Sequence, residues 1–259
     1  MMLLPRSVLI TGASSGIGRA LALAYAKPGV HLALSGRNEK RLKSIVQACA
    51  DAGSSVNCEI LDVTNKDDMR TWVTDVDNNE PLDLVIANAG VSGGTGGSGE
   101  TENQTRMIFE TNINGIFNTV FPAADLMRAR KNGQIALVSS LASFRGFVGA
   151  PAYSASKAAV RTYGEALRGL LQGDGIGVSV ICPGFVESRM TAGNKYKMPF
   201  LMTAERAAAI IQRGVAHNKA RIAFPFPIYF LSWFLGSLPP GLTDPLFRIL
   251  PKKNSVTGI

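Results

Sequence analysis

Short apolar runs alternate along this chain with longer segments in which apolar residues recur at helical spacing. The short runs are almost wholly apolar, which is typical of strands buried on both faces of a parallel sheet. They predict strands at Ser7–Thr11, Val30–Ser35, Ser55–Leu61, Leu82–Asn88, Gln134–Ser139, Val178–Cys182 and Arg221–Phe224. The longer segments predict helices at Gly16–Lys27, Glu39–Ala52, Lys66–Asn78, Glu102–Arg130, Tyr153–Leu171 and Ala204–Asn218. We expect a bend in the longest helix near Pro122.

This alternation predicts an α/β fold, a three-layer, doubly wound parallel sheet of about seven strands with helices on both faces. The chain has 259 residues and shows neither an internal repeat nor a break in composition. We therefore expect one domain over residues 1–259.

Two stretches depart from the alternation. Ser92–Gly99 is rich in glycine and predicts a mobile loop after a strand, whereas Ile222–Thr243 contains no charged residue. Prolines confine any continuous helix in the second stretch to about Ile228–Leu238, which is shorter than the ~20 residues of a membrane span. We expect this apolar C-terminal extension, over about residues 222–259, to pack on the protein, on a partner subunit or on a membrane surface, there helped by Lys252 and Lys253.

Composition narrows the class of protein. The net charge is +8, but the basic residues are spread without a Lys/Arg run, so we expect no nucleic-acid partner. Cys49, Cys58 and Cys182 are scattered, without the spacing of a metal site or a disulfide framework. We therefore expect free thiols, which are typical of proteins in a reducing compartment. The N-terminus leads directly into a strand without the pattern of a signal peptide, so we expect a cytoplasmic protein that holds no metal.

A glycine-patterned turn joins the first predicted strand to the first helix. Such a turn lets the backbone approach a diphosphate, which the N–H groups and positive dipole end of the helix then bind. The strand–turn–helix context therefore predicts a dinucleotide site in a Rossmann fold. The candidate cofactor-binding residues of the turn are Gly12, Ser14, Ser15, Gly16, Ile17 and Gly18.

The end of the second strand favours NADP(H) over NAD(H). NAD-preferring sites place a carboxylate there, but this chain has Arg37, which can pair with a 2′-phosphate; the alternative is that Arg37 only covers a helix surface. Asp62 and Val63 end the third strand and fit an adenine contact, although Asp62 could instead cap the next helix. The fourth strand ends at Asn88, Ala89 and Gly90, where the crevice of the sheet should open.

Tyr153 and Lys157 lie one helical turn apart and hence on one helix face. An ammonium beside a phenol lowers its pKa, which suits a proton-transfer group next to a dinucleotide. A serine at the end of the preceding strand, Ser139 or Ser140, completes the combination. Only one of them should face the site, because successive strand side chains point to opposite faces.

These motifs together resemble the short-chain dehydrogenase/reductase family of the single-domain kind. The matching segments cover residues 7 to about 190, in the order 11–18, 88–90, 112–115, 139–140, 153–157 and 183–188. The resemblance implies that Tyr153 is the general acid/base and that Lys157 holds the nicotinamide ribose and lowers the tyrosine pKa. It implies that Ser140 steadies the substrate oxygen and that Asn112 holds a water in a proton relay.

The resemblance also implies the rest of the site. Pro183, Gly184, Val186 and Ser188 would contact the nicotinamide half of the cofactor, and about 185–203 would form a substrate loop or lid. The family pattern ends near residue 190, so the substrate stays open. Candidate pocket residues, which could equally be surface residues, are Arg145, Phe147, Lys195, Tyr196 and Lys197. Family members commonly form homodimers or homotetramers through the two longest helices.

The function that follows is an NADP(H)-dependent oxidoreductase that interconverts a secondary alcohol and its ketone, a small-molecule substrate whose candidates include steroids, acyl-chain ketones, keto-sugars and xenobiotic carbonyls. One alternative is an epimerase or dehydratase, but such relatives carry a longer C-terminal domain and a different glycine turn. A non-catalytic, cofactor-sensing protein is the other alternative. The retention of Asn112, Ser140, Tyr153 and Lys157 argues against it.

Overall fold

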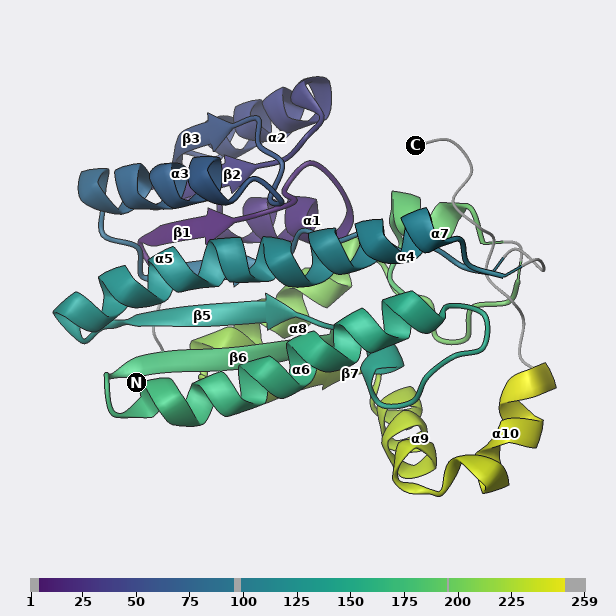
Figure 1. Cartoon of the computed structure of the whole chain (residues 1–259). Coiled ribbons are helices and arrows are strands. Elements are labelled where there is room, and N and C mark those ends of the chain that lie inside the picture. Colours follow the sequence, from purple (N-terminus) through teal and green to yellow (C-terminus); the bar gives the residue numbers. More distant parts are fainter. Residues whose placement is uncertain (1–4, 96–98, 195, 250–259) are drawn as a thin grey trace.

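The computed structural model describes residues 5–95, 99–194 and 196–249. Its strands form one seven-stranded sheet in the order β3-β2-β1-β4-β5-β6-β7 (Figure 1), and every pairing is parallel. The strands are β1 (Ser7–Ile10), β2 (His31–Ser35), β3 (Ser55–Glu59), β4 (Leu84–Ala87), β5 (Gly133–Val138), β6 (Ile176–Pro183) and β7 (Arg221–Phe224). The predicted fold class is confirmed.

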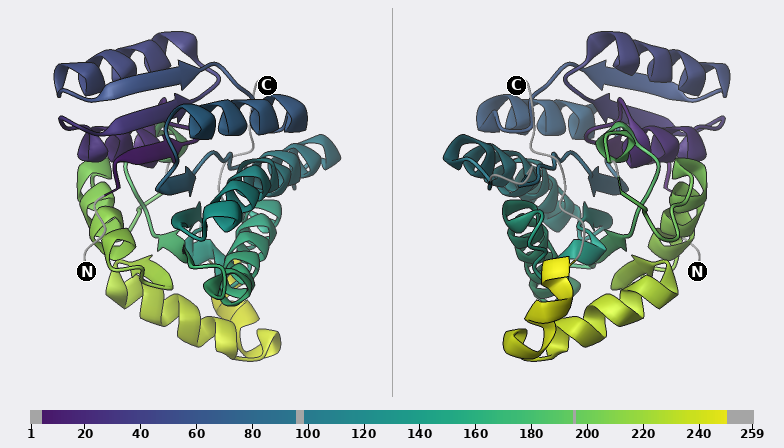
Figure 2. Two further views of the ribbon diagram at one scale, coloured as in Figure 1. Left: turned by 90° about the vertical axis from the view of Figure 1, so that its left-hand side faces the viewer. Right: turned by 90° about the vertical axis from the view of Figure 1, so that its right-hand side faces the viewer.

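Helices cover both faces of the sheet (Figures 1 and 2). They are α1 (Gly16–Tyr25), α2 (Glu39–Asp51), α3 (Lys66–Asn79), α4 (Glu102–Phe109), α5 (Gly115–Arg130), α6 (Pro151–Gln172), α7 (Arg189–Ala192), α8 (Ala204–Ala216), α9 (Phe226–Ser237) and α10 (Pro240–Ile249). Two short elements, the π-helical turn η1 (Glu110–Asn114) and the 3-10 turn η2 (Leu141–Ser143), complete the described chain.

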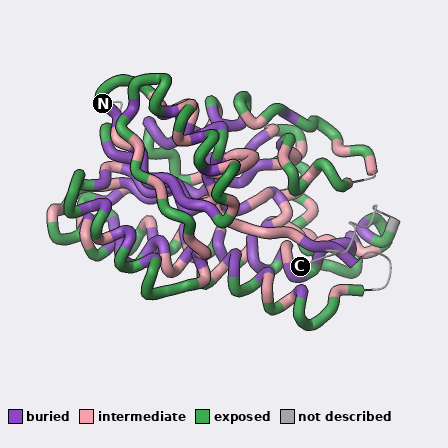
Figure 3. Tube along the Cα trace, turned by 90° about the horizontal axis from the view of Figure 1, so that it is seen from above, coloured by how far each residue is buried: buried purple, intermediate pink, exposed green. Residues whose placement is uncertain are grey.

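The strand side chains alternate between two hydrophobic cores. Val8 and Ile10 of β1 pack with α1, α2 and α8, whereas Leu9 faces α3, α5 and α6. In the register of the sheet, Leu9 pairs with Ala33 of β2 on one side and with Val85 of β4 on the other. Buried residues follow the strands through the middle of the trace (Figure 3), as two-faced burial of a parallel sheet requires.

The long helix before β5 differs from its prediction. Its irregular turn is η1, not Pro122, which lies inside α5. A π-helical turn accommodates an extra residue and is often found at functional sites. It places Asn112 in the interior, where the side chain is fully buried.

The first helix of the C-terminal extension, α9, ends before Pro239 as predicted but begins two residues before the expected Ile228, and a second helix was not predicted. Pro227 lies in the first turn of α9, and a second helix, α10, begins at Pro240. A proline is tolerated in the first turn because the N–H that it lacks would have no partner within the helix. No helix in the described ranges has both the length and the apolar character needed to cross a membrane.

Candidate active site

A cavity of about 430 Å³ opens at the carboxyl ends of the strands. The strand order reverses between β1 and β4, and ligands of such sheets bind at this point. The lining includes every catalytic and cofactor-binding residue predicted from the sequence except Gly18 and Asn112. The topology therefore gathers segments from the whole length of the chain around one volume of ligand size.

The glycine turn is fastened to the end of β4. Thr11 Oγ1 accepts hydrogen bonds from the backbone N–H groups of Asn88 (3.0 Å) and Ala89 (3.1 Å). Asn88 Nδ2 in turn donates to the carbonyl of Thr11 at 2.9 Å. Gly12 has φ +68°, and a Cβ there would lie 2.9 Å from Ala89 Cα, so only glycine fits this turn.

Gly18 lies outside the cavity lining. A Cβ on Gly18 would lie 2.4 Å from the carbonyl oxygen of Gly12 and 2.5 Å from Asn88 Nδ2. The residue thus allows α1 to pack closely on the turn. The role of Gly18 in bringing the helix close to a diphosphate stays a prediction.

Four charged side chains surround the end of the cavity beside β2 and β3. Arg37 lies 3.5 Å from Asp62, and Arg41 and Arg189 line the same region. Burial would raise the pKa of Asp62, but hydrogen bonds from Thr64 and the charge of Arg37 lower it overall. Burial, together with the neighbouring charge of Arg189, lowers the pKa of Arg41.

Sequence reasoning missed two of these arginines. The Nε atom of Arg41 is buried and has no hydrogen-bond partner among the described residues, which marks a place for an acceptor. The spacing of Arg41 four residues after Arg37 could have indicated it. No spacing in the sequence indicated Arg189, because only the fold brings this residue close to Arg41.

Tyr153 and Ser140 share a hydrogen bond in the cavity. Burial raises the pKa of Tyr153, and the hydrogen bond with Ser140 lowers it only in part. The buried Lys157 donates from Nζ to the carbonyl of Val138 at 2.9 Å, and its Nζ lies 5.9 Å from the centre of the Tyr153 ring. The expected lowering of the Tyr153 pKa by Lys157 is not found in the protein alone, where burial raises this pKa and Lys157 is not among the groups that shift it.

Burial also changes the ammonium itself. It lowers the pKa of Lys157 to about 8 because the charged form is poorly solvated. The ammonium therefore stays largely protonated at neutral pH, although its pKa lies only slightly above that pH. A carbonyl and an aromatic face, rather than a carboxylate, surround this charge.

The two serines at the end of β5 face different partners. Ser139 donates its hydroxyl hydrogen to the carbonyl of Lys157 at 2.7 Å. The hydroxyl oxygen of Ser140 instead accepts from the N–H of Ala142 at 3.1 Å and lies at Tyr153. Ser139 therefore holds the helix that carries Lys157, and Ser140 is placed beside the phenol.

Asn112 lies behind the cavity and not in its lining. Its Oδ1 accepts from the N–H of Val91 at 2.8 Å, and its Nδ2 donates to the carbonyl of Val91 and to Ser156 Oγ, both at 3.0 Å. The side chain thus fastens the end of β4 to α6. Because its polar atoms have protein partners, this carboxamide positions α6, and the part of Asn112 in a proton relay stays a prediction.

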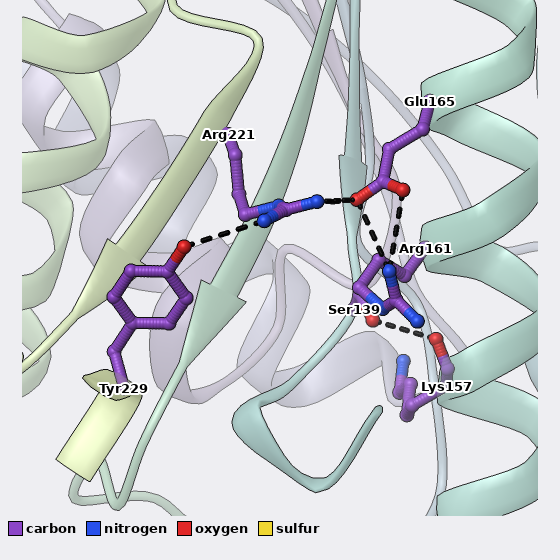
Figure 4. A network of polar contacts seen from close by, with 6 residues as sticks. All are labelled: Ser139, Lys157, Arg161, Glu165, Arg221 and Tyr229. Atoms are coloured by element: carbon purple, nitrogen blue, oxygen red, sulfur yellow. Dashed lines mark hydrogen bonds and ion pairs between the residues drawn. The ribbon is translucent and has the colours of Figure 1, made fainter. Parts of the chain in front are cut away.

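A polar network connects α6 to β7 and α9 (Figure 4). Glu165 accepts hydrogen bonds from Arg161 (3.2 Å) and from Arg221 Nε (3.1 Å), and Arg221 Nη1 donates to Tyr229 Oη at 3.3 Å. The guanidinium carbons of Arg161 and Arg221 lie 4.8 and 5.4 Å from the centre of the Phe144 ring. The network anchors α9 to the helix that carries Tyr153 and Lys157.

The candidate pocket residues divide into two groups. Phe147 and Tyr196 line the cavity, whereas Lys197 and Arg145 do not; Lys195 lies outside the described residues. The Arg145 guanidinium instead turns to α10, where it donates to Thr243 at 3.1 Å and pairs with Asp244 at 2.8 Å. The apolar C-terminal segment was expected to pack on the protein, with a cap at the pocket mouth as one possibility, and α9 does line the cavity with Ile228 and Ser232.

The fold and the glycine turn at its crevice define the class of Rossmann-fold dehydrogenases. The family described as short chain dehydrogenase matches residues 6–198. The chain is 40% identical over 246 residues, 95% of its own length and 97% of the relative's, to a protein of Myxococcus xanthus (strain DK1622) named an uncharacterized oxidoreductase. It belongs to the short-chain dehydrogenases and is an oxidoreductase of that family.

Two further comparisons extend this result. The chain is 32% identical over 250 residues to the 3beta-hydroxysteroid dehydrogenase of Mediterraneibacter gnavus (strain ATCC 29149 / DSM 114966 / JCM 6515 / VPI C7-9), covering 96% of this chain and 82% of that one. A short-chain dehydrogenase from Mycobacterium paratuberculosis, solved bound to NAD, shares the fold with a TM-score of 0.74, 24% identity and coverage of 84% and 94% of the two chains.

Proposed function

We propose that this protein is an NADP(H)-dependent oxidoreductase that interconverts a bulky apolar secondary alcohol and its ketone. The observation that carries the proposal is the Ser140–Tyr153 hydroxyl pair, with Lys157 beside it, in one cavity with the glycine turn. A hydroxyl pair at that place can hold a carbonyl oxygen and exchange a proton with it.

The residues of the cavity fit a nicotinamide dinucleotide along its length. The N-terminus of α1 would bind the diphosphate, and Asp62 and Val63 would contact the adenine. Pro183, Gly184, Val186 and Ser188 line the same cavity and would contact the nicotinamide half. A bound dinucleotide supplies or accepts the hydride.

Side chains of the protein would bind the carbonyl oxygen of the substrate and transfer its proton. Ser140 would donate a hydrogen bond to the carbonyl oxygen, and Tyr153 would give that oxygen its proton during reduction. Burial raises the pKa of Tyr153, which keeps the phenol protonated and suits the acid role. Lys157 would hold the nicotinamide ribose, and its charge would favour the phenolate when Tyr153 acts as a base.

The arginines beside β2 support NADP(H) over NAD(H). A 2′-phosphate would provide an acceptor for the buried Nε of Arg41 and would relieve the repulsion between Arg41 and Arg189. Arg37 lies 3.5 Å from Asp62, and its guanidinium would pair with the 2′-phosphate in place of that carboxylate. The NAD found in one structural neighbour belongs to a protein of 24% identity, with which only the fold is shared.

The substrate half of the cavity supports an apolar substrate. Its lining includes Leu141, Phe147, Phe185, Tyr196 and Ile228. A relative of this chain is named for a hydroxysteroid, and a steroid-like alcohol suits the apolar character of this lining. We further propose that about 185–203 acts as the substrate loop and that the chain forms a homodimer or homotetramer through α4–α5 and α6.

Turnover of a panel of steroid and other apolar ketones with NADPH, followed by absorbance, tests the reaction. Tyr153→Phe should lower turnover by about 10²- to 10⁴-fold because the proton donor is lost. Tyr163→Phe is the matched control on the same helix, since Tyr163 packs against Phe117 with ring centres 5.0 Å apart. Equal turnover in the two variants would contradict the role of Tyr153.

The cofactor preference is tested by the affinities for NADPH and NADH. Arg37→Asp and Arg41→Met should each weaken NADPH binding by about tenfold or more, because a charge-assisted hydrogen bond contributes about 1.5–3 kcal/mol. NADH binding should change far less. Arg106→Met, which removes an exposed arginine on α4, is the control. A parallel loss for both cofactors would contradict the assignment.

A further inference from the structure

Helices α9 and α10, the C-terminal cap (residues 226–249), extend from the body of the protein beyond β7 (Figures 1 and 2). None of the residues of α9 is buried, although nearly all are apolar. The exposed apolar side chains of the cap, with their exposed fractions, are Phe226 (71%), Phe230 (52%), Leu231 (54%), Trp233 (47%), Phe234 (46%), Leu242 (72%) and Leu246 (44%). Such a contiguous apolar surface marks an interaction site.

The aromatic side chains form a ladder along one side of α9. Phe226, Phe230 and Phe234 recur every four residues and stack with ring centres 6.3 and 6.4 Å apart. Trp233 lies against Phe230 at 6.0 Å. Aromatic residues presented on one side of a short helix are typical of helices that lie in the plane of a membrane interface.

The inner side of α9 faces the candidate active site. Ile228 and Ser232 line the cavity. A Cβ on Gly236 would lie 2.1 Å from the carbonyl oxygen of Phe144, so α9 packs directly on the segment that follows Ser140. One helix therefore separates the cavity from the exposed aromatic ladder.

Charge distinguishes between the possible occupants of this surface. Asp244 is the only acidic residue of the sequence after Glu205, and Arg145 already pairs with it. Arg248 is exposed on α10, and Lys252 and Lys253 follow in the sequence. A second copy of the cap would bring like charges together, whereas an anionic surface would complement them.

We propose that the outer face of the cap docks on an anionic lipid bilayer, with α9 lying in the membrane plane. The aromatic ladder enters the interface, and the positive charge of the sequence that follows it is attracted to the anionic headgroups. The cavity wall formed by Ile228 and Ser232 then lies next to the membrane. This inference does not depend on the proposed function, because docking is measured without turnover.

Cosedimentation of the full chain with vesicles tests the proposal. The protein should bind vesicles of phosphatidylcholine mixed with phosphatidylserine more tightly than vesicles of phosphatidylcholine alone. Phe230→Ser with Trp233→Ser should weaken binding to both by about tenfold or more, and Lys252→Gln with Lys253→Gln should weaken only the binding to anionic vesicles. Ile60→Ser with Phe200→Ser is the matched control, because these side chains are exposed by 48% and 60% outside the cap.

A second readout does not depend on a variant that folds poorly. The chain has two tryptophans; Trp72 is buried at 6% exposure, whereas Trp233 is 47% exposed. Anionic vesicles should shift the tryptophan emission of the unaltered protein to shorter wavelength, and Trp233→Phe should abolish that shift. Absence of vesicle binding, or equal binding by the aromatic and control variants, overturns the proposal. So does a cap variant that changes only the oligomeric state, which would make a second copy the occupant.

Discussion

The sheet with its flanking helices and the C-terminal cap are both rich in apolar residues, but the first region buries them and the second exposes them. Leu34 of β2 lies fully buried in the core around β1, whereas Phe230 of α9 is 52% exposed. Strands β1 and β4 are buried at every position, but no position of α9 is buried. An apolar side chain therefore stabilises the sheet by leaving water on folding, and most of the apolar surface of the cap gains nothing until a further partner covers it.

The two regions also differ in how they are held. Parallel ladders and two hydrophobic cores hold the sheet. A few specific contacts hold the cap, among them Arg221 with Tyr229 and Arg145 with Asp244. We expect substitutions in the body to change global stability and substitutions in the cap to change local docking and substrate binding.

Matched truncations should give the largest difference between the two regions. Leu34→Ala leaves a cavity in the core and should lower the free energy of unfolding by about 2–5 kcal/mol. Phe230→Ala removes an exposed ring and should change it by less than about 0.5 kcal/mol. Urea unfolding followed by circular dichroism measures both. A comparable loss in Phe230→Ala would mean that the cap is part of the cooperative core.

The buried charge of Lys157 should give a pH-dependent difference. Folding lowers its pKa from 10.5 to about 8, so between these values the unfolded chain binds more protons and stability rises with pH. Below pH 8 the buried ammonium costs up to about 3 kcal/mol. Lys157→Met should therefore be more stable than the unaltered protein at neutral pH and should lose this advantage towards pH 10.5.

Thermal melting of both proteins across this pH range measures the effect. Lys157→Met also removes the hydrogen-bond donor to the Val138 carbonyl. This loss is independent of pH, so it does not change the slope of stability against pH. Parallel curves for the two proteins would show that the ammonium is solvated rather than buried.

Two glycines at close backbone contacts allow a finer test. Gly18→Ala brings a Cβ to 2.4 Å from the Gly12 carbonyl oxygen and should cost about 2 kcal/mol together with dinucleotide affinity. Gly236→Ala meets the Phe144 carbonyl oxygen, but the C-terminal end of α9 has no buried residue and can shift outward while Ile228 and Tyr229 stay packed on the cluster that includes Leu141. Its cost should stay below about 1 kcal/mol, with a raised KM for substrate and an unchanged NADPH affinity. Equal losses of melting temperature would remove the distinction between the regions.

The smallest expected effect concerns the contact of α10 with the body. Arg145→Met removes the bonds to Thr243 and Asp244 and the guanidinium that lies 4.7 Å from the Phe247 ring centre. The cost should be about 1 kcal/mol, and α10 should become more sensitive to limited proteolysis. Arg106→Met, which loses only an exposed pair with Glu102, is the control. Unchanged proteolysis of α10 would show that Arg145 does not hold it.

The sequence carried most of the fold because its signals are local. Apolar runs and glycine turns predicted the strands, their parallel arrangement and the place of the crevice, and the spacing of Tyr153 and Lys157 predicted that they share a helix face. The prolines of the cap misled, because the first turn of a helix accepts proline. The pKa of Tyr153 could not be predicted either, since it depends on how deeply the fold buries the phenol.

By itself, the sequence determined the fold class and the order of the motifs, because periodicity and backbone freedom act between near neighbours. Only the tertiary structure decided which distant groups meet. It placed Arg189 beside Arg41, turned Arg145 towards α10 and made α9 a wall of the cavity. The physical reason is that charge, burial and access to solvent belong to the assembled surroundings of a residue, which segments far apart in the chain create together.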